Sequence, residues 1–185
     1  MLIGLVGYKG SGKGEVARAL EAHRDFSTVK MAGALKEMLR SLLAYQGVEA
    51  KMIERMIEGD LKEVPLDVLG GRTPRHAMQT LGTEWGRDFI GDGYWVKTFN
   101  RRAEQFRDVV CDDVRFHNEA DAIKRRGGFL VRVVRPDNRI DLTHQSEREI
   151  ASIRCDVAIV NDKDVAHLHR AAQVIVEELR DLAAA

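Results

Sequence analysis

A glycine-rich segment near the start of the chain has the residue types of a phosphate-binding loop. Residues 7–13 read GYKGSGK and fit the pattern GxxxxGK. Glycines suit this task because backbone N–H groups must turn inward around phosphate oxygens with no Cβ in the way. A helix starting near Lys13 would add its positive end, and Lys13 would reach the β- and γ-phosphates. The candidate contacts to a nucleoside triphosphate are Gly7, Lys9, Gly10, Ser11, Gly12, Lys13, Gly14 and Glu15.

The two residues after Lys13 depart from the usual form of such loops. Gly14 stands where a Ser or Thr usually touches Mg²⁺, and Glu15 follows it. A carboxylate in the first turn of a helix suits the helix dipole, but close to phosphates it would repel them. We therefore expect Glu15 to point outward, which leaves the contact between this loop and a metal ion open.

An acidic pair, Asp112 and Asp113, follows the apolar run 108–111. A carboxylate at the end of a buried strand can ligate Mg²⁺ or orient its water ligands. The alternative is that either residue only caps the next turn. We predict that at least one of the two serves a metal ion, directly or through water.

Arginines gather in two further segments. Arg72, Arg75 and Arg87 lie close together in the sequence, with Gln79 and Trp85 between them. The planar guanidinium group binds phosphate with two parallel hydrogen bonds, so we expect this segment to hold a phosphorylated acceptor. Trp85 could stack on a base and Gln79 could bond its edge, whereas the alternative for Trp85 is a core position.

The second group of arginines lies in or beside a polar loop that follows an apolar run. Its members are Arg132, Arg135 and Arg139. We expect the loop to act as a lid over the triphosphate, with at least one arginine reaching a phosphate.

The elements that must position these residues alternate between short apolar strands and amphipathic helices. We predict strands over 2–6, 108–111, 129–134 and 156–160, and helices over 15–23, 35–45, 49–58, 74–90, 93–106, 118–126 and 165–182. This alternation favours a parallel sheet covered on both faces, with ligands at the carboxyl ends of the strands.

Composition limits the class of protein further. Lys plus Arg and Asp plus Glu number 29 each, so the chain lacks the basic surplus of a dedicated duplex-binding protein. Cys111 and Cys155 have no metal-ligand spacing and are expected to be buried, reduced thiols. The first apolar run is too short for a signal peptide or a membrane span. We expect a cytoplasmic protein without stable nucleic-acid or membrane binding; its oligomeric state is open, a homodimer included.

Several segments together resemble the phage-type deoxynucleoside monophosphate kinases along nearly the whole chain. In order they are GYKGSGKGEVA, MAGALKEMLRSLL, QTLGTEWGRDFIGDGYW, VVCDDVRFHNEADAIKRRGG, VRVVRP, HQSE and VNDKDVAHL. The segments LGTEWGRD and DVRFxNEA are much more specific to this family than the glycine loop, which many kinases share.

The resemblance implies an α/β P-loop NTPase fold in one domain: a parallel sheet of about five strands flanked by helices. The core would span 1–33 and 107–185, a helical acceptor-binding insertion about 34–106, and a short lid about 135–147. The implied reaction moves the γ-phosphate of ATP, with Mg²⁺, to a deoxynucleoside 5′-monophosphate (dNMP). Such an enzyme would be encoded by a phage and supply DNA precursors in the host bacterial cytoplasm.

The resemblance and the residue types together assign roles at the expected site. The catalytic candidates are Lys13, Asp113, Arg115, Arg135 and Arg139. Asn161 and Asp162 would lie near the adenine of ATP. The candidate contacts to the dNMP are Lys36, Arg72, Arg75, Gln79, Trp85, Arg87, Asp88 and Trp95.

Two other functions remain open from the residues alone. A kinase of similar build could act on dephospho-coenzyme A or another alcohol, with Asp112 or Asp113 as the base. Alternatively, the chain could be a nucleotide-binding regulator or a DNA-packaging accessory without phosphotransfer. The neutral charge and the arginine-rich acceptor segment argue against the latter.

Overall fold

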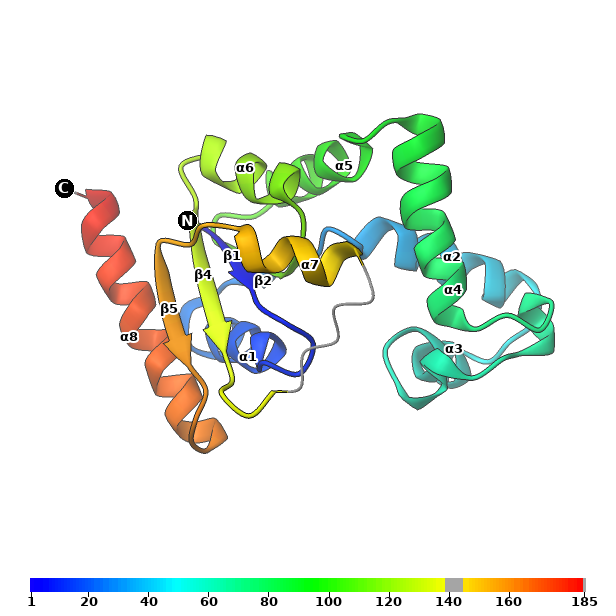
Figure 1. Cartoon of the computed structure of the whole chain (residues 1–185), viewed down its shortest axis with the longest axis horizontal. Helices are drawn as coiled ribbons and strands as arrows, with labels where there is room; N and C mark the ends of the chain where they lie inside the picture. Colours follow the sequence, from blue (N-terminus) through cyan, green and yellow to red (C-terminus); the bar gives the residue numbers. More distant parts are fainter. Residues whose placement is uncertain (139–144, 185) are drawn as a thin grey trace. The chain divides into compact units, whose positions relative to one another are not determined.

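The computed structural model describes residues 1–138 and 145–184 and divides the chain into two compact units (Figure 1). Unit 1 consists of Met1–Met31 and Asn100–Ala185, and unit 2 of Ala32–Phe99. Unit 1 contains the sheet, and unit 2 is helical.

The sheet of unit 1 has five parallel strands in the order β2-β3-β1-β4-β5. They are β1 (Leu2–Val6), β2 (Ser27–Thr28), β3 (Val109–Val114), β4 (Phe129–Val134) and β5 (Val157–Val160). Because β1 lies at the centre, all five of its residues are buried, as the unbroken apolar run predicts. The expectation of a five-stranded parallel α/β fold is confirmed.

Helices cover both faces of this sheet. On one face, α1 (Lys13–Arg24) and α8 (Val165–Ala184) pack on a core that includes Ile3 and Leu5. On the other face, α6 (His117–Arg125) packs so closely over β1 that a Cβ at Gly4 would come within 2.5 Å of Ile123. The helix α7 (Gln145–Ser152) completes the unit.

Unit 2 is built from helices around its own core. These are α2 (Gly33–Tyr45), α3 (Ala50–Ile57), two short 3₁₀ turns (Asp60–Glu63 and Asp67–Leu69), α4 (Pro74–Thr80), a π-helix (Leu81–Ile90) and α5 (Tyr94–Ala103), whose last residues belong to unit 1. The core includes Leu39, Leu43, Ile57 and Trp95.

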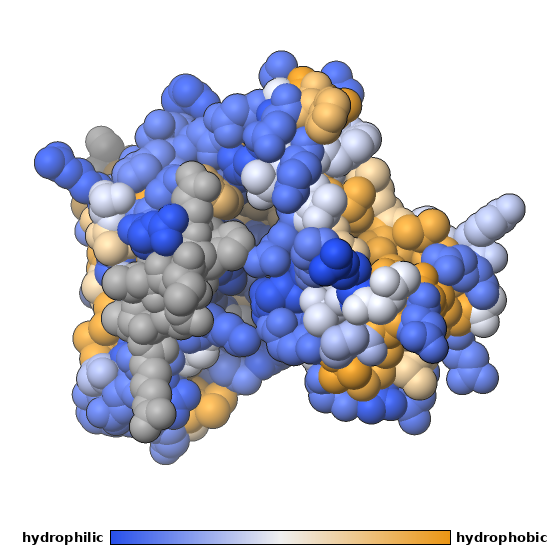
Figure 2. Space-filling view, turned by 45° about the vertical axis from the view of Figure 1, so that its right-hand side comes forward, coloured by the Kyte–Doolittle hydropathy of each residue, from blue (hydrophilic) through white to orange (hydrophobic). Residues whose placement is uncertain are grey.

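Some large apolar side chains of unit 2 remain at its surface. Leu42, Phe89 and Ile90 are each at least half exposed. Figure 2 shows apolar residues, in orange, on the surface of the molecule. None of the helices within residues 1–138 and 145–184 combines the length and hydropathy needed to cross a bilayer.

The structure corrects four expectations from the sequence. The predicted helix 74–90 changes from α to π geometry at Leu81. The strand β3 extends to Val114, so the acidic pair lies inside the strand rather than after it. The helix α7 begins at Gln145, inside the segment of about 135–147 that was expected to form the lid loop. Cys155 is only half buried, whereas Cys111 is fully buried.

The π-helix packs against Trp95 through its glycines. The indole N–H of Trp95 donates a hydrogen bond of 2.8 Å to the carbonyl of Gly82. A Cβ at Gly86 would lie 2.2 Å from the indole nitrogen of Trp95, so only glycine leaves room there. The two glycines of LGTEWG therefore have a packing role that their spacing alone did not predict.

Candidate active site

The glycine loop joins β1 to α1 and has the backbone conformation that the phosphate-binding pattern requires. Gly10 and Gly12 have φ angles of 82° and 107°, which favour glycine because a Cβ would be strained there. The side chain of Lys13 is almost buried, and its ammonium donates to the carbonyls of Gly7 at 2.5 Å and Tyr8 at 2.9 Å. Lys13 is thus held at the loop by the loop's own backbone.

Two further features of the loop suit a polar ligand. A Cβ at Gly7 would lie 2.5 Å from the carbonyl oxygen of Val133, so the loop is pressed against β4. The hydroxyl of Ser11 is buried and has no hydrogen-bond partner among the described residues. Because buried hydroxyl groups are nearly always bonded, this one suits a loop that receives phosphate oxygens.

Glu15 is turned toward side chains of two helices. Arg18, one turn along α1, hydrogen-bonds both carboxylate oxygens of Glu15, and His169 of α8 lies 3.4 Å from one of them. The hydrogen bond from Arg18 lowers the pKa of Glu15, with a smaller contribution from His169. The charge that would repel phosphates is therefore compensated.

The acidic pair forms a bulge beside the start of the loop. Cys111 pairs with Gly4 and Val114 with Val6, so Asp112 and Asp113 together oppose the single residue Leu5. The side chains of neighbouring strand residues normally point to opposite faces of the sheet, and a bulge changes the direction of one of these side chains. This places the pair level with the last residues of β1, immediately before the glycine loop.

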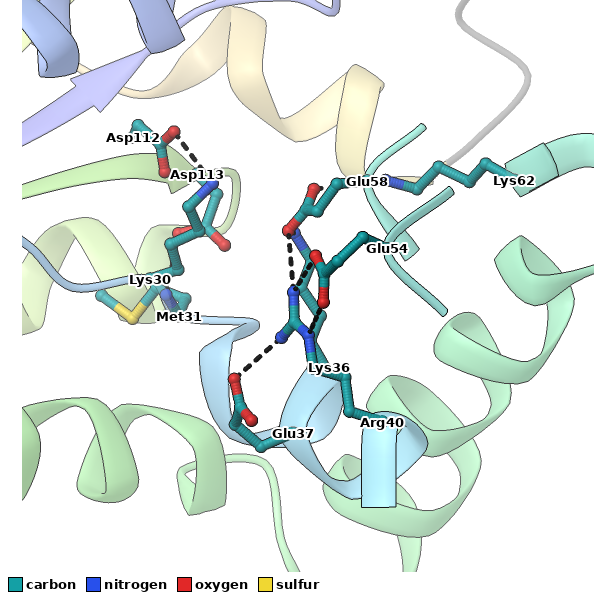
Figure 3. Close-up of polar contacts among 10 residues, drawn as sticks. All are labelled: Lys30, Met31, Lys36, Glu37, Arg40, Glu54, Glu58, Lys62, Asp112 and Asp113. Carbon is teal, nitrogen blue, oxygen red and sulfur yellow. Dashed lines mark hydrogen bonds and ion pairs between the residues drawn. The ribbon is translucent and has the colours of Figure 1, made fainter. Parts of the chain in front are cut away.

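Both carboxylates contact the segment that follows β2 (Figure 3). Asp113 accepts a hydrogen bond of 2.8 Å from the backbone N–H of Met31, and Asp112 lies 3.3 Å from the ammonium of Lys30. The thiol of Cys111 also donates to Asp113, at 3.3 Å, and burial raises the pKa of this thiol. Within the described residues, no group of three or more His, Cys, Asp or Glu side chains could hold a metal ion.

The segment after the acidic pair contains a structural residue that the sequence analysis missed. The buried carboxylate of Glu119 accepts hydrogen bonds from the backbone N–H groups of Arg115, at 2.8 Å, and Phe116, at 3.2 Å. Glu119 thus reaches back from the first turn of α6 to the backbone before the helix, which caps the helix and fixes the backbone at Arg115. The Glu three residues after Phe116 was the signal that could have revealed it.

The predicted lid is only partly described. Arg135 is exposed, whereas Arg139 lies outside the described residues with the rest of 139–144. Arg132 is not a lid residue, because its guanidinium donates to the carbonyls of Ile150, at 3.2 Å, and Ile153. It holds the end of α7.

The residues predicted near the adenine follow β5. The side-chain amide of Asn161 donates to the carbonyl of Ser11 at 2.9 Å, so this residue contacts the glycine loop directly. Asp162 is exposed. A second asparagine that the sequence analysis missed, Asn138, donates to the carbonyl of Lys9 at 2.7 Å.

Three cations of the predicted acceptor site have carboxylate partners within unit 2. Lys36 lies 2.7 Å from Glu58, Arg75 pairs with Glu63, and Arg87 lies 3.0 Å from Asp92. In addition, Arg40 of α2 makes two hydrogen bonds to Glu54 and one to Glu37 (Figure 3). Arg40 was not among the residues predicted for this site.

The remaining acceptor candidates differ in exposure. Trp85 is half buried, with its ring edge-on to Tyr94 at 5.6 Å between centroids, and Gln79 is also half buried. Arg72 and Asp88 are exposed. Trp95 is only 3% exposed, so its position favours a packing role over contact with a substrate.

Comparison with known proteins decides the family. The sequence model of the family described as Deoxynucleotide monophosphate kinase matches residues 56–171. A protein of Acanthamoeba polyphaga mimivirus named as a deoxynucleotide monophosphate kinase is 35% identical, with 91% of this chain and 92% of that chain covered. The chain belongs to the deoxynucleotide monophosphate kinase family. The predicted resemblance is thereby confirmed.

Two further likenesses concern a second relative and a solved structure. The deoxynucleotide monophosphate kinase of enterobacteria phage T4 is 29% identical over 51% of this chain and 41% of its own. The structure of the dephospho-CoA kinase from Campylobacter jejuni aligns over 96% of each chain, with a TM-score of 0.50 and 10% identity. At that identity the likeness shows a shared fold.

The assignment to the deoxynucleotide monophosphate kinase family does not depend on the glycine loop. The family match begins at residue 56, after the loop, and includes both the π-helix and the acidic pair. These segments carry LGTEWGRD and DVRFxNEA, the most specific parts of the resemblance.

Proposed function

We propose that the protein transfers the γ-phosphate of ATP to a deoxynucleoside 5′-monophosphate, giving the diphosphate and ADP. The observation that carries this proposal is the glycine loop with Lys13 at its end, in a chain whose mimivirus relative, named for this substrate class, matches it along nearly its whole length. The viral and phage origin of the relatives supports a role in supplying DNA precursors inside an infected cell.

Catalysis in this proposal is mostly positioning and charge neutralisation. The N-terminal end of α1 and the ammonium of Lys13 offset negative charge on the triphosphate as the phosphoryl group moves. The acceptor is already a phosphate anion, so no strong general base is required. The protein's main task is to hold the two substrates in line.

We further propose that the acidic pair serves Mg²⁺. The donor set fits this ion, which takes one or two carboxylates and completes its shell with water and substrate phosphate oxygens. When bound, Mg²⁺ would neutralise charge on the phosphates. Because Arg18 and His169 engage Glu15, and Gly14 has no side chain, Asp112 and Asp113 are the residues that would hold it.

For the acceptor, we propose that Arg75 and Arg87 of unit 2 bind the dNMP phosphate. Lys36, Arg72, Gln79, Trp85 and Asp88 are further candidates in the same unit. Arg75 and Arg87 each pair with a carboxylate on an exposed side chain, Glu63 and Asp92. The pair of Arg75 with Glu63 is solvent-accessible on both sides and contributes little to stability, so a phosphate can replace this carboxylate at small cost.

A kinase acting on dephospho-coenzyme A is the alternative within this fold. Product analysis separates the two: the protein is incubated with ATP and each of the four dNMPs, their ribose counterparts, or dephospho-coenzyme A. We expect a deoxynucleoside diphosphate from at least one dNMP. Phosphorylation of dephospho-coenzyme A alone would contradict the proposal.

A further inference from the structure

Two asparagines hold the glycine loop through its backbone carbonyls. We propose that Asn138 and Asn161 are positioning residues for ATP, because their side-chain amides fix the orientation of two backbone N–H groups in the loop. This inference rests on the proposed function for the identity of the nucleotide, but its central measurement, ATP binding, does not require an acceptor substrate.

The contacts come from two segments far from the loop in sequence. Asn138 follows β4, and its side-chain nitrogen donates to the carbonyl of Lys9 at 2.7 Å. Asn161 follows β5, and its side-chain nitrogen donates to the carbonyl of Ser11 at 2.9 Å. The loop is therefore held at two alternate peptide groups by two different segments.

The planarity of the peptide group converts these contacts into a constraint on N–H groups. In a trans peptide the C=O of one residue and the N–H of the next point in opposite directions. A donor that fixes the carbonyl of Lys9 therefore fixes the N–H of Gly10, and a donor on Ser11 fixes the N–H of Gly12. These two N–H groups face away from the asparagines.

The asparagines are themselves held in place and lie against the loop. The backbone N–H of Asn161 donates to the carbonyl of Val134 at 2.7 Å, which ties the residue to the end of β4. A Cβ at Gly12 would lie 2.6 Å from the amide nitrogen of Asn161, and one at Gly10 would lie 3.2 Å from the amide oxygen of Asn138. Larger residues at either glycine would displace the asparagine beside it.

The physical benefit is that the loop is ordered before the nucleotide binds. Gly10 and Gly12 have more conformational freedom than other residues, and fixing that freedom on binding would weaken affinity. Because the two amides already hold the peptide groups, phosphate oxygens meet N–H groups that need little rearrangement.

The test measures ATP affinity in the absence of acceptor for Asn138→Ala, Asn161→Ala and the corresponding Asn→Asp variants. Alanine removes the donor, and aspartate removes it while keeping the shape and adding a negative charge. We expect the Kd for ATP to rise about three- to ten-fold with alanine, the loss of one hydrogen bond, and further with aspartate. The KM for the acceptor should stay unchanged.

Asn100→Asp is the matched control, because Asn100 lies in unit 1 and its side-chain oxygen accepts from Arg126 at 3.2 Å, a contact that aspartate keeps. We expect its Kd for ATP to equal that of the parent. The melting temperature of each variant is measured together with its Kd for ATP, to detect a general loss of stability.

Kd values within two-fold of the parent in both alanine variants would overturn the inference. So would a large fall in melting temperature with ATP and acceptor binding weakened together, because the asparagines would then support the fold in general. If the parent binds ATP but phosphorylates no dNMP, the proposed function fails and this inference is still tested. If the parent does not bind ATP, both fail.

Discussion

Lys13 and Glu15 stand two residues apart at the start of α1, carry opposite charges and have different partners. The ammonium of Lys13 contacts loop carbonyls, whereas the carboxylate of Glu15 contacts Arg18 and His169. Residues of α1 and α8 thus keep the negative charge of Glu15 balanced next to a loop that is expected to receive phosphates. This balance depends on pH.

The pH dependence of stability should reveal the Glu15 interaction. Arg18 depresses the pKa of Glu15 below its ordinary value of 4.5 in the folded protein, so the contact stabilises the fold above that pH. This contribution is lost as the pH falls through the folded-state pKa. We therefore expect Glu15→Gln to lower the melting temperature at pH 7, with the difference from the parent shrinking below about pH 4.5.

Melting curves from pH 3 to 8 for the parent, Glu15→Gln and Glu178→Gln would test this prediction. Glu178 is an exposed carboxylate on α8 and serves as the control. A difference between the parent and Glu15→Gln that is the same at every pH would contradict the prediction.

Among the elements, the two central strands β1 and β4 were predicted best because each is a short run of mostly apolar residues. The strands β1 and β4 were predicted with the bounds that the structure has. The two-residue strand β2 is too short to leave a pattern, and α7 follows a polar segment that resembles a loop. The π geometry that begins at Leu81 accompanies a hydrogen bond from Trp95 to the carbonyl of Gly82, and helical spacing encodes neither.

Gly86→Ala tests the packing of the π-helix against Trp95. The added methyl group would meet the indole of Trp95 at about 2.2 Å, so the π-helix or α5 must shift. Overpacking of this kind typically costs about 1–3 kcal/mol in the free energy of unfolding. Denaturant unfolding should show this loss, whereas Gly93→Ala, with nothing within 4 Å of the added Cβ, should unfold like the parent. Equal stability of both variants would contradict the packing account.

In the bulge of β3, Asp112 contacts Lys30 and Asp113 contacts Met31. Replacing each aspartate by asparagine tests the proposal that the pair holds Mg²⁺. Asn at 113 can still accept the N–H of Met31, so Asp113→Asn removes charge with little change in structure. We expect Asp113→Asn to need more Mg²⁺ for half-maximal rate than Asp112→Asn, in agreement with the DVR motif. If only Asp112→Asn needs more Mg²⁺, the metal is assigned to Asp112 instead. If neither variant needs more Mg²⁺ than the parent, the proposal that the acidic pair holds the metal is contradicted.

For the whole molecule, the proposed ATP-binding loop could be predicted much further than the proposed acceptor-binding residues. The glycine loop is a contiguous pattern whose residues are already neighbours in the chain. By contrast, Asn138 lies 129 residues from the loop carbonyl that it contacts, and no local pattern reveals it. Asn161 was expected near ATP from the resemblance, but its bond to the loop carbonyl 150 residues away was not. The carboxylate partners of Arg75 and Arg87 likewise became visible only in the structure.

Arg75→Ala and Arg87→Ala separate a substrate contact from a structural one. Losing a charged contact to the dNMP phosphate should cost about 1.5–3 kcal/mol, or roughly ten- to a hundred-fold in kcat/KM for the dNMP. Losing only the solvent-accessible ion pair of Arg75 with Glu63 would cost at most about 1 kcal/mol of stability. We expect ATP affinity without acceptor to stay near that of the parent and Arg→Lys to restore activity only partly. Normal dNMP kinetics with a lower melting temperature would make these arginines structural.

The most direct test of the account is the rate of ADP formation from ATP with and without each dNMP, measured for the parent and for Lys13→Met. The account predicts that the parent forms ADP rapidly only when an accepted dNMP is present, with an equal amount of the deoxynucleoside diphosphate. Lys13→Met, folded with a similar melting temperature, should lose at least about a hundred-fold in kcat. A rate of ADP formation that is the same with and without dNMPs would contradict this prediction. So would a Lys13→Met variant with kcat within a few-fold of the parent.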